Sequence, residues 1–437
     1  MQAQPERGPG ADLLDRLAEH PPPGPFRPRT WTSPIRGPWL TSVFASVLLA
    51  GLPVVIVTGL LSYAAYEPRF GQAFPAHPGL LRLPYFSWPA NPAWLYRLNQ
   101  GVHVGLGLAL IPVVLAKLWS VIPKLFTWPP ARSLAQIAER VSLLLLVGGI
   151  LFELVTGVLD IQYWYVFKFD FYTAHYYGAW VFSAAFVSHV ALKLPVMVRS
   201  LRSRRFRDEL RTPLADTRPE PMDPDELVSP APGTPTMSRR GALALVGGGS
   251  LAITAVTLGE TLGDSVRPTA LLSSRGRSYG SGPTDFQVNR TAATAQISPV
   301  AAGDAWRLTL RSATPVVLTR AQLLAMPQHT ARLPIACVEG WSTVQTWRGV
   351  RLADLLAASG VRSLDRAVVR SLEKEGAFAT AVLNRHQVLA ADALLALTVN
   401  GVDLSPDHGY PARVIVPATP GVHNTKWVRE IEFVEGS

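Results

Sequence analysis

The sequence contains little cysteine and little charge. Cys337 is the only cysteine among 437 residues, so no disulfide can form within the chain, and this thiol is a metal ligand, a nucleophile or an inert core group. Charged residues make up 16% of the chain and hydrophobic residues 48%, which is too apolar for an ordinary soluble protein. Basic residues outnumber acidic ones by 41 to 31, but the arginines cluster at the ends of apolar runs, so nucleic acid is not expected as a partner.

Long apolar runs explain the low charge. Each run has about twenty residues, which is enough to cross a bilayer as a helix. We therefore predict an all-α transmembrane four-helix bundle in residues 38–200, followed by a fifth, anchoring helix. The first four runs cover residues 38–64, 102–125, 140–160 and 175–197, and the fifth covers residues 241–262.

Positive charge around the runs predicts the orientation of the helices. Arginine and lysine are frequent before the first run, between the second and third, and after the fourth, and cytoplasmic loops carry such an excess. The prediction is a multi-pass protein of the cell membrane with a cytoplasmic N-terminus and with the region after residue 263 outside the cytoplasm. Proline and charge are abundant in residues 1–37, predicted to be a disordered cytoplasmic tail, and in residues 201–237, predicted to be an unstructured cytoplasmic linker.

Arg239 and Arg240 stand directly before the fifth run. They are either a simple positive flank of a transmembrane helix or the arginine pair of a twin-arginine signal, which exports proteins in folded form. The Gly/Ala-rich, weakly apolar run that follows favours the export signal. Because no Ala-x-Ala cleavage site comes soon after it, residues 238–263 are predicted to be a signal that stays in the membrane as a helix.

Residues 275–437 have the composition of a folded domain. Strand-like segments and a short helix over residues 352–358, stopped by Gly360, predict an α+β fold, and Asn400-Gly401 predicts a tight hairpin turn. The predicted strands cover residues 306–311, 331–338, 367–372, 412–418 and 427–434.

Three histidines lie in the apolar runs, where an ionisable side chain is costly and usually functional. His103 is in the second run, whereas His175 and His189 share one face of the fourth, about 21 Å apart along the helix axis. The fourth run, together with the Val-Gly-Leu-Gly that follows His103, resembles the cytochrome b subunits of respiratory hydrogenases and formate dehydrogenases. The resemblance implies that His103 and His175 ligate one haem b near the outer surface.

The sequence departs from that family at the first helix. The relatives supply a ligand of a second, inner haem there, whereas this chain has no histidine between His20 and His77. The prediction is therefore one haem b, with His189 either a ligand of a second haem or a polar residue satisfied within the bundle. Glu153, in the third run, is either a packing acid or a proton carrier near a quinone site.

Three segments of the C-terminal region carry a second resemblance. Cys337-Val-Glu-Gly-Trp-Ser is followed by Asp407-His-Gly-Tyr-Pro and then by Gly421-Val-His-Asn-Thr-Lys. In order and spacing they resemble the molybdopterin domain of the sulfite oxidase family, closest to its periplasmic methionine sulfoxide reductase branch. The resemblance implies that the thiolate of Cys337 binds molybdenum at the catalytic centre. It also implies that the pterin and its phosphate are held by Asn289, Arg290, Thr291, Ser371, His408, Arg413, Asn424, Thr425 and Lys426.

The residues after Cys337 bear on the substrate. Sulfite oxidases place positive charge there, whereas this chain has Glu339 and Trp341, which is a poor setting for an anion. We therefore expect reduction of a neutral S-oxide or N-oxide, free or protein-bound, such as methionine sulfoxide. The electrons would come from the quinone pool through haem b.

Two other functions remain open at this stage. Arg290, Arg348 and Arg370 could line the pocket and restore an anion site, which would favour a sulfite dehydrogenase that passes electrons to the membrane. The chain could also be a non-enzymatic electron-transfer or haem-sensing membrane protein whose outer domain has lost its metal. The resemblance implies a monomer, because the sequence ends after residues 427–434 without the immunoglobulin-like dimerisation module of sulfite oxidases.

Overall fold

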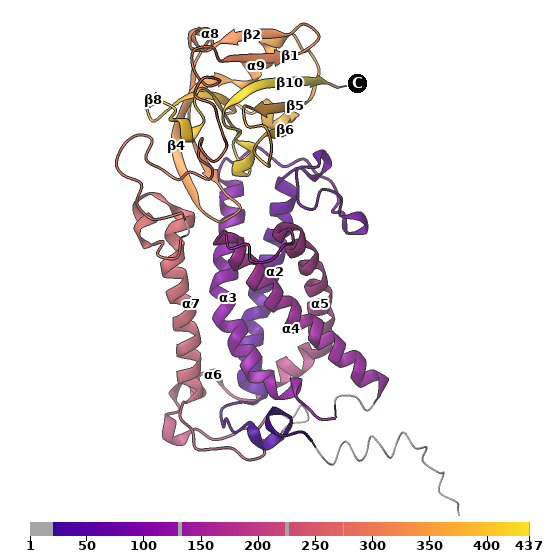
Figure 1. Cartoon of the computed structure of the whole chain (residues 1–437). Coiled ribbons are helices and arrows are strands. Elements are labelled where there is room, and N and C mark those ends of the chain that lie inside the picture. The colour runs from indigo at the N-terminus through magenta and orange to yellow at the C-terminus, as the bar shows by residue number, and fades with distance from the viewer. Residues whose placement is uncertain (1–20, 130–132, 223–226, 274, 437) are drawn as a thin grey trace, which may run out of the picture. The chain divides into compact units, whose positions relative to one another are not determined.

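The computed structural model describes residues 21–129, 133–222, 227–273 and 275–436 (Figure 1). Contacts divide the chain into two compact units, and each is described by itself. The first unit contains the described parts of Met1–Val54, Gly107–Gly157 and Ala174–Ile253, and the second contains those of Val55–Leu106, Val158–Thr173 and Thr254–Ser437.

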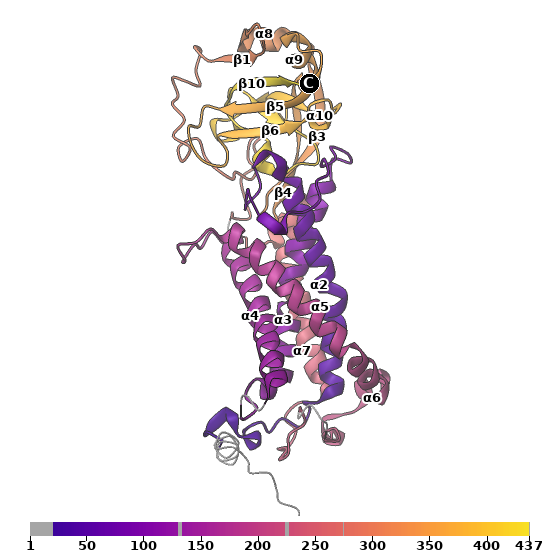
Figure 2. The ribbon, with the colours of Figure 1, turned by 90° about the vertical axis from the view of Figure 1, so that its right-hand side faces the viewer.

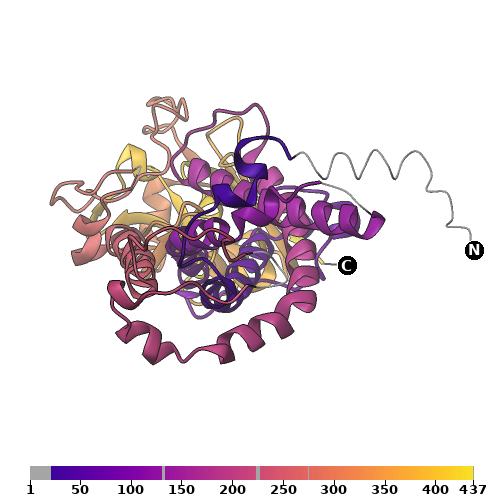
Figure 3. The ribbon, with the colours of Figure 1, turned by 90° about the horizontal axis from the view of Figure 1, so that it is seen from below.

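Five helices are long and apolar enough to cross a membrane, with mean hydropathies from 1.7 to 2.4 over their most apolar stretches. They are seen from the side in Figure 1, and Figure 3 shows the same ribbon from below. Their existence confirms the five predicted apolar helices and is consistent with membrane association, whereas the membrane crossings, the bundle and the orientation stay predictions. The helices are α2 (Pro38–Ala65), α3 (Leu95–Leu125), α4 (Leu134–Ile161), α5 (Phe171–Ser203) and α7 (Arg239–Leu262).

Short helices lie in the first part of the predicted linker (residues 201–237) and in the described part of the predicted tail (residues 1–37). In the linker, α5 continues to Ser203, and α6 (Phe206–Arg211) and η5 (Leu214–Asp216) follow. The prediction that residues 201–237 are unstructured is therefore wrong for residues 201–216, whereas the described residues between 217 and 237 form no helix or strand. In the tail, residues 1–20 lie outside the described residues, and the rest includes the 3-10 helices η1 (Gly24–Phe26) and η2 (Pro28–Thr30).

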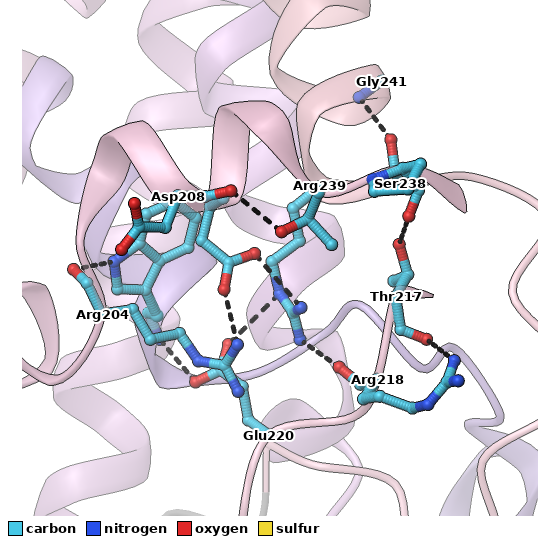
Figure 4. A network of polar contacts seen from close by, with 12 residues as sticks. Arg204, Asp208, Thr217, Arg218, Glu220, Ser238, Arg239 and Gly241 are labelled. Carbon is cyan, nitrogen blue, oxygen red and sulfur yellow. Dashed lines mark hydrogen bonds and ion pairs between the residues drawn. The ribbon is translucent and has the colours of Figure 1, made fainter. Parts of the chain in front are cut away.

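A buried ion-pair cluster orders the linker (Figure 4). The guanidinium of Arg239 lies 3.5 Å from Oε2 of Glu209 and 3.7 Å from Oε1 of Glu220, and it donates to the carbonyl of Arg218 at 3.0 Å. Glu220 also accepts a hydrogen bond from the backbone amide of Trp39, at the start of α2. A carboxylate there satisfies an amide that the helix itself leaves without a partner. Because these partners are far apart in sequence, composition alone could not reveal the order of the linker.

The C-terminal part of the second unit contains two five-stranded sheets. The first has the order β2-β1-β10-β5-β6, of which β10, β5 and β6 are labelled side by side in Figure 2. Its strands are β1 (Arg307–Arg311), β2 (Val316–Thr319), β5 (Leu364–Ser371), β6 (Thr380–Asn384) and β10 (Val428–Glu435). The second has the order β3-β4-β7-β8, with β9 also paired to β7. Its strands are β3 (His329–Ala336), β4 (Ser342–Arg351), β7 (Leu394–Val399), β8 (Val402–Asp403) and β9 (Arg413–Ile415).

Most of the predicted strands and the predicted short helix are confirmed, with ends shifted by a few residues. Asn400 and Gly401 have φ values of 51° and 86°, as a type I′ hairpin turn between β7 and β8 requires. The predicted strand ranges missed β2, β4, β6, β7 and β8. The predictions also missed α8 (Arg320–Ala325) and α10 (Arg385–Val388), whereas α9 (Leu352–Ser359) was expected.

Two apolar clusters form the core of this region. Leu308, Leu310 and Val369, from the first sheet, belong to the larger one, which also includes Leu395 and Val414 from the second sheet. Phe286, Trp341 and Trp347 belong to the smaller one, and Cys337 packs against it. The cysteine turn is therefore anchored by packing against an apolar cluster.

Residues between α2 and α3 are bonded to the C-terminal strands within the same unit. Glu67 is fully buried, and its Oε1 accepts hydrogen bonds from the side-chain amide of Asn384 at 2.5 Å and from the backbone of Trp88 at 3.1 Å. The indole of Trp88 donates to the carbonyl of Ala418 at 2.6 Å. The second compact unit thus extends beyond residues 275–437.

Candidate functional site

Cys337 lies in the turn between β3 and β4. The turn is closed by hydrogen bonds from the amide of Cys337 to the carbonyl of Trp341 at 3.0 Å and from the amide of Gly340 to the carbonyl of Cys337 at 3.1 Å. Gly340 has a φ of +93°, a conformation that side chains rarely permit. The cysteine is half-buried, and desolvation raises the pKa of its thiol to about 11. Without a metal this thiol stays protonated at neutral pH, whereas a bound metal would displace the proton.

An ion pair between Glu339, in this turn, and Arg275 lies close to Cys337. Glu339 is buried and accepts a hydrogen bond from the indole of Trp341 at 2.5 Å. The guanidinium of Arg275 meets both carboxylate oxygens of Glu339, at 3.2 and 3.3 Å, and its charge lowers the pKa of the Cys337 thiol against the effect of burial. The surroundings of the thiol therefore contain a cation, but one with its own counter-ion.

Five of the nine residues predicted to hold the pterin lie in the C-terminal segment, from His408 to Lys426. Lys426 and Arg413 are buried, and burial lowers the pKa of both, that of Arg413 to about 9. Among the described residues, several buried polar atoms here have no hydrogen-bond partner, although such atoms are normally satisfied. They are Nδ1 of His408, Nε of Arg413, both ring nitrogens of His423, Nδ2 of Asn424 and Oγ1 of Thr425. This cluster, the orphan-donor cluster below, has the chemistry of a site for a polar anion.

Local structure fixes the orphan-donor cluster. His408 ends a 3-10 turn, η7 (Pro406–His408), and its ring stacks on Phe286 with centroids 3.6 Å apart. Its Nε2 is hydrogen-bonded to the carbonyl of Thr284 at 2.9 Å, so the unpartnered nitrogen is Nδ1. Gly409 follows with a φ of +107°, and a Cβ there would lie 3.0 Å from the Cβ of Lys426. Glycine is needed for the lysine stem to pass this turn.

Of the predicted pterin residues that precede the cluster in sequence, only Arg290 and Ser371 contact Lys426. The Nζ of Lys426 donates to the carbonyls of Arg290 at 2.5 Å and of Asp407 at 2.9 Å, and the hydroxyl of Ser371 donates to the carbonyl of Lys426 at 2.8 Å. Arg290 and Ser371 are therefore adjacent to Lys426.

Asn289 and Thr291 instead bond within their own loop. The Oδ1 of Asn289 accepts a hydrogen bond from the amide of Arg290, and the hydroxyl of Thr291 bonds to that of Thr294. These hydrogen bonds direct both side chains to their own loop and not to Lys426.

Sequence reasoning missed several residues of the site. His423 stood in the quoted Gly421 motif but received no role, although it is buried beside Tyr66 with ring centroids 5.7 Å apart. Glu373 pairs with Arg290 at 2.7 Å, and nothing in its sequence context marked it. Arg275 stands at the start of the predicted domain and received no role from the sequence. Arg370, considered as a pocket cation, is instead held by Glu430 and Glu432.

The two histidines predicted to bind haem each use Nδ1 for a hydrogen bond. His103 bonds the carbonyl of Val55 at 3.0 Å, and His175 bonds the hydroxyl of Thr156 at 3.0 Å with Glu153 at 3.2 Å. Metal-binding histidines usually engage the second nitrogen in this way, so Nε2 is the nitrogen that iron would take. His103 and His175 belong to different compact units, and the haem stays a prediction.

Residues 295–437 match the family model described as oxidoreductase molybdopterin binding domain. The chain is also similar to the uncharacterized oxidoreductase YuiH of Bacillus subtilis, with 34% identity over 122 residues, covering 28% of this chain and 60% of the relative. The NADH nitrate reductase of Spinacia oleracea is 35% identical over 130 residues, covering 27% of this chain and 14% of the relative. The sulfite oxidase of Arabidopsis thaliana is 33% identical over 102 residues, covering 20% and 26%.

The crystal structure of the sulfane dehydrogenase SoxCD from Paracoccus pantotrophus aligns at 26% identity and a TM-score of 0.28, covering 30% of this chain and 39% of that chain. This chain thus spans less than two thirds of each of these relatives. The family match covers the cysteine turn and the orphan-donor cluster. The C-terminal region of this chain is therefore a molybdopterin-binding oxidoreductase domain of the sulfite oxidase type.

Proposed function

We propose that the chain is a membrane-anchored molybdenum oxidoreductase that reduces a neutral S-oxide or N-oxide, such as methionine sulfoxide, outside the cytoplasm. The observation that carries the substrate class is the pairing of Arg275 with Glu339 beside Cys337. An anionic substrate needs a cation whose charge is not already balanced, whereas a polar neutral oxide needs only hydrogen-bond donors.

The proposed roles follow from where each side chain lies. Cys337 supplies the thiolate ligand, because a soft sulfur donor suits a metal that is also held by dithiolene sulfur. Lys426 and Arg413 bind the phosphate of the pterin, while His408, Asn424 and Thr425 offer it their buried unpartnered atoms. The molybdenum–pterin group supplies the two-electron oxygen-atom chemistry when bound, and the chain positions it and sets its surroundings.

The membrane part would feed electrons to this site. We infer one haem b on His103 and His175, reduced from the quinone pool, with Glu153 and Thr156 orienting the ring of His175. The contact between Glu153 and His175 favours this supporting role over the earlier alternatives of a packing acid or a proton carrier. The helices suit a multi-pass membrane protein, and the arginines before α2 and after α5 support a cytoplasmic N-terminus.

Sulfite oxidation is the second candidate, because burial raises the pKa of Glu339 to about 8. If Glu339 were protonated in the working enzyme, the charge of Arg275 would be left to bind an anion. The bidentate contact with Arg275 favours the ionised carboxylate and hence the neutral substrate.

Replacing Cys337 with Ser is expected to reduce oxygen-atom transfer to the background of cofactor-free protein. The purified chain would be assayed with methionine sulfoxide and reduced viologen, and in parallel with sulfite and ferricyanide. Thr343→Ser, a mild change in the following strand, is the matched control and should keep activity. A Cys337→Ser variant with parental activity would contradict the ligand role, and activity on sulfite alone would favour the second candidate.

Replacing Lys426 with Met is expected to lower molybdenum and pterin occupancy about tenfold, because a hydrogen bond to a charged group contributes about 1.5–3 kcal/mol. Lys374→Met removes the same charge from an exposed position of the same domain and should leave occupancy unchanged. The readout is metal and pterin content per chain. Equal loss in both variants would show that the site does not depend on Lys426.

His103→Ala and His175→Ala are each expected to remove the low-spin haem b spectrum, whereas His189→Ala should reduce it little. The reason is that only one haem has a complete predicted ligand pair. A pyridine haemochrome assay on the purified chain should give one haem per chain. Two haems would overturn this count, and a normal spectrum in His103→Ala would overturn the ligand assignment.

Changing Arg239 and Arg240 together to Lys is expected to keep the domain after residue 275 in the cytoplasm, because lysine preserves positive charge but not the arginine pair of an export signal. Arg239 is also buried against Glu209 and Glu220, so a folding defect must be separated from an export defect. The control is Glu209→Gln with Glu220→Gln, which loosens the cluster but keeps both arginines. Protease accessibility in spheroplasts should fall only in the Lys-Lys variant; loss in both would assign the effect to the ion pairs.

A further inference from the structure

The turn that carries Cys337 is bonded to two of the apolar helices. The carbonyl of Val338 accepts a hydrogen bond from Nε2 of Gln100, in α3, at 2.5 Å. The carbonyl of Gly340 accepts one from the hydroxyl of Thr261, in α7, at 3.0 Å. All of these residues belong to the second compact unit. Two backbone groups of the cysteine turn are therefore satisfied from outside the residues that match the molybdopterin domain.

Gln100 is itself held in place. Only 3% of its surface is exposed, and its Oε1 accepts a hydrogen bond from the hydroxyl of Ser62, in α2, at 2.6 Å. With Oε1 engaged by Ser62, the amide nitrogen is directed at Val338. A buried amide with both ends bonded fixes its neighbours, because leaving either end unsatisfied costs free energy.

A close backbone approach adds to these hydrogen bonds. A Cβ on Gly340 would lie 2.9 Å from Cγ1 of Val104, so the turn packs directly on α3. Val104 follows Gln100 by four positions, which places both on one face of the helix. The same face of α3 thus contacts the turn through a hydrogen bond and through packing.

We propose that Gln100 is a positioning residue for Cys337, and that Gln100, Val104 and Thr261 together set the turn that presents the thiol. The molybdenum-binding site would then be completed by helices α3 and α7. The inference rests on the proposed ligand role of Cys337 for its meaning, but its test reads the thiol directly and needs neither haem nor substrate.

The test measures how fast iodoacetamide alkylates Cys337 in the full-length chain, purified in detergent from cells that make no pterin cofactor. Cys337 is the only cysteine, so every alkylation event reports on this turn. Gln100→Met, which keeps the length but not the hydrogen bond, should speed alkylation about three- to tenfold at fixed pH, because losing one such bond shifts a local opening by about that factor. Thr261→Val should act in the same direction.

Asn99 provides a matched control. It is a buried amide on the same helix, but its Nδ2 donates to the carbonyl of Thr58, in α2, at 2.9 Å and not to the turn. Asn99→Leu should therefore alkylate at the parental rate. In protein loaded with cofactor, the Mo(V) electron paramagnetic resonance line shape should change in Gln100→Met and not in Asn99→Leu.

Two results would overturn the proposal. One is a parental alkylation rate in both Gln100→Met and Thr261→Val. The other is equal acceleration in Asn99→Leu, which would show general loosening of the helices. Either result would leave the proposed oxidoreductase function standing, because that function is tested by cofactor content and oxide reduction.

Discussion

Buried positive charge beside buried side-chain donors that lack a hydrogen-bond partner is the constraint on which the catalytic region depends. Lys426 and Arg413 are almost fully enclosed, and burial lowers the pKa of both. Around them, ring nitrogens and side-chain donors of His408, His423 and Asn424 have no partner among the described residues. Such an arrangement is costly in an empty site and favourable around an anion, which is why it supports the pterin phosphate as the group it holds.

At the cysteine turn, in contrast, the charged and polar groups already have partners. Its nearby cation, Arg275, is balanced by Glu339, and its backbone carbonyls are bonded to Gln100 and Thr261. The orphan-donor cluster, which favours an anion, therefore lies in the same domain as the Cys337 thiol, beside which the charge of Arg275 is already neutralised by Glu339. This contrast separates the part of the site that would bind the cofactor from the part that would select the substrate.

The sequence was most informative where a pattern is local. Long apolar runs predicted the five helices, and Asn400-Gly401 predicted its turn, because length and backbone preference are properties of neighbouring residues. Strand β4 was missed because polar residues and Gly349 interrupt its apolar pattern. Gly349 lies at a shift in the β4–β7 register, where any side chain would collide with the carbonyl oxygen of Leu395. The roles of Gln100 and Arg275, like the order of the linker around Arg239, depend on partners far along the chain. No periodicity in the sequence encodes such contacts.

The central claim is that this chain holds one molybdenum–pterin group. It is tested most directly by measuring molybdenum and pterin in the purified full-length protein, from cells that also load a known molybdenum enzyme with its cofactor. The account predicts about one molybdenum and one pterin per chain, since one cysteine and one orphan-donor cluster are present in the described residues. Protein that is folded but contains neither, while the reference enzyme from the same cells is fully loaded, would contradict it.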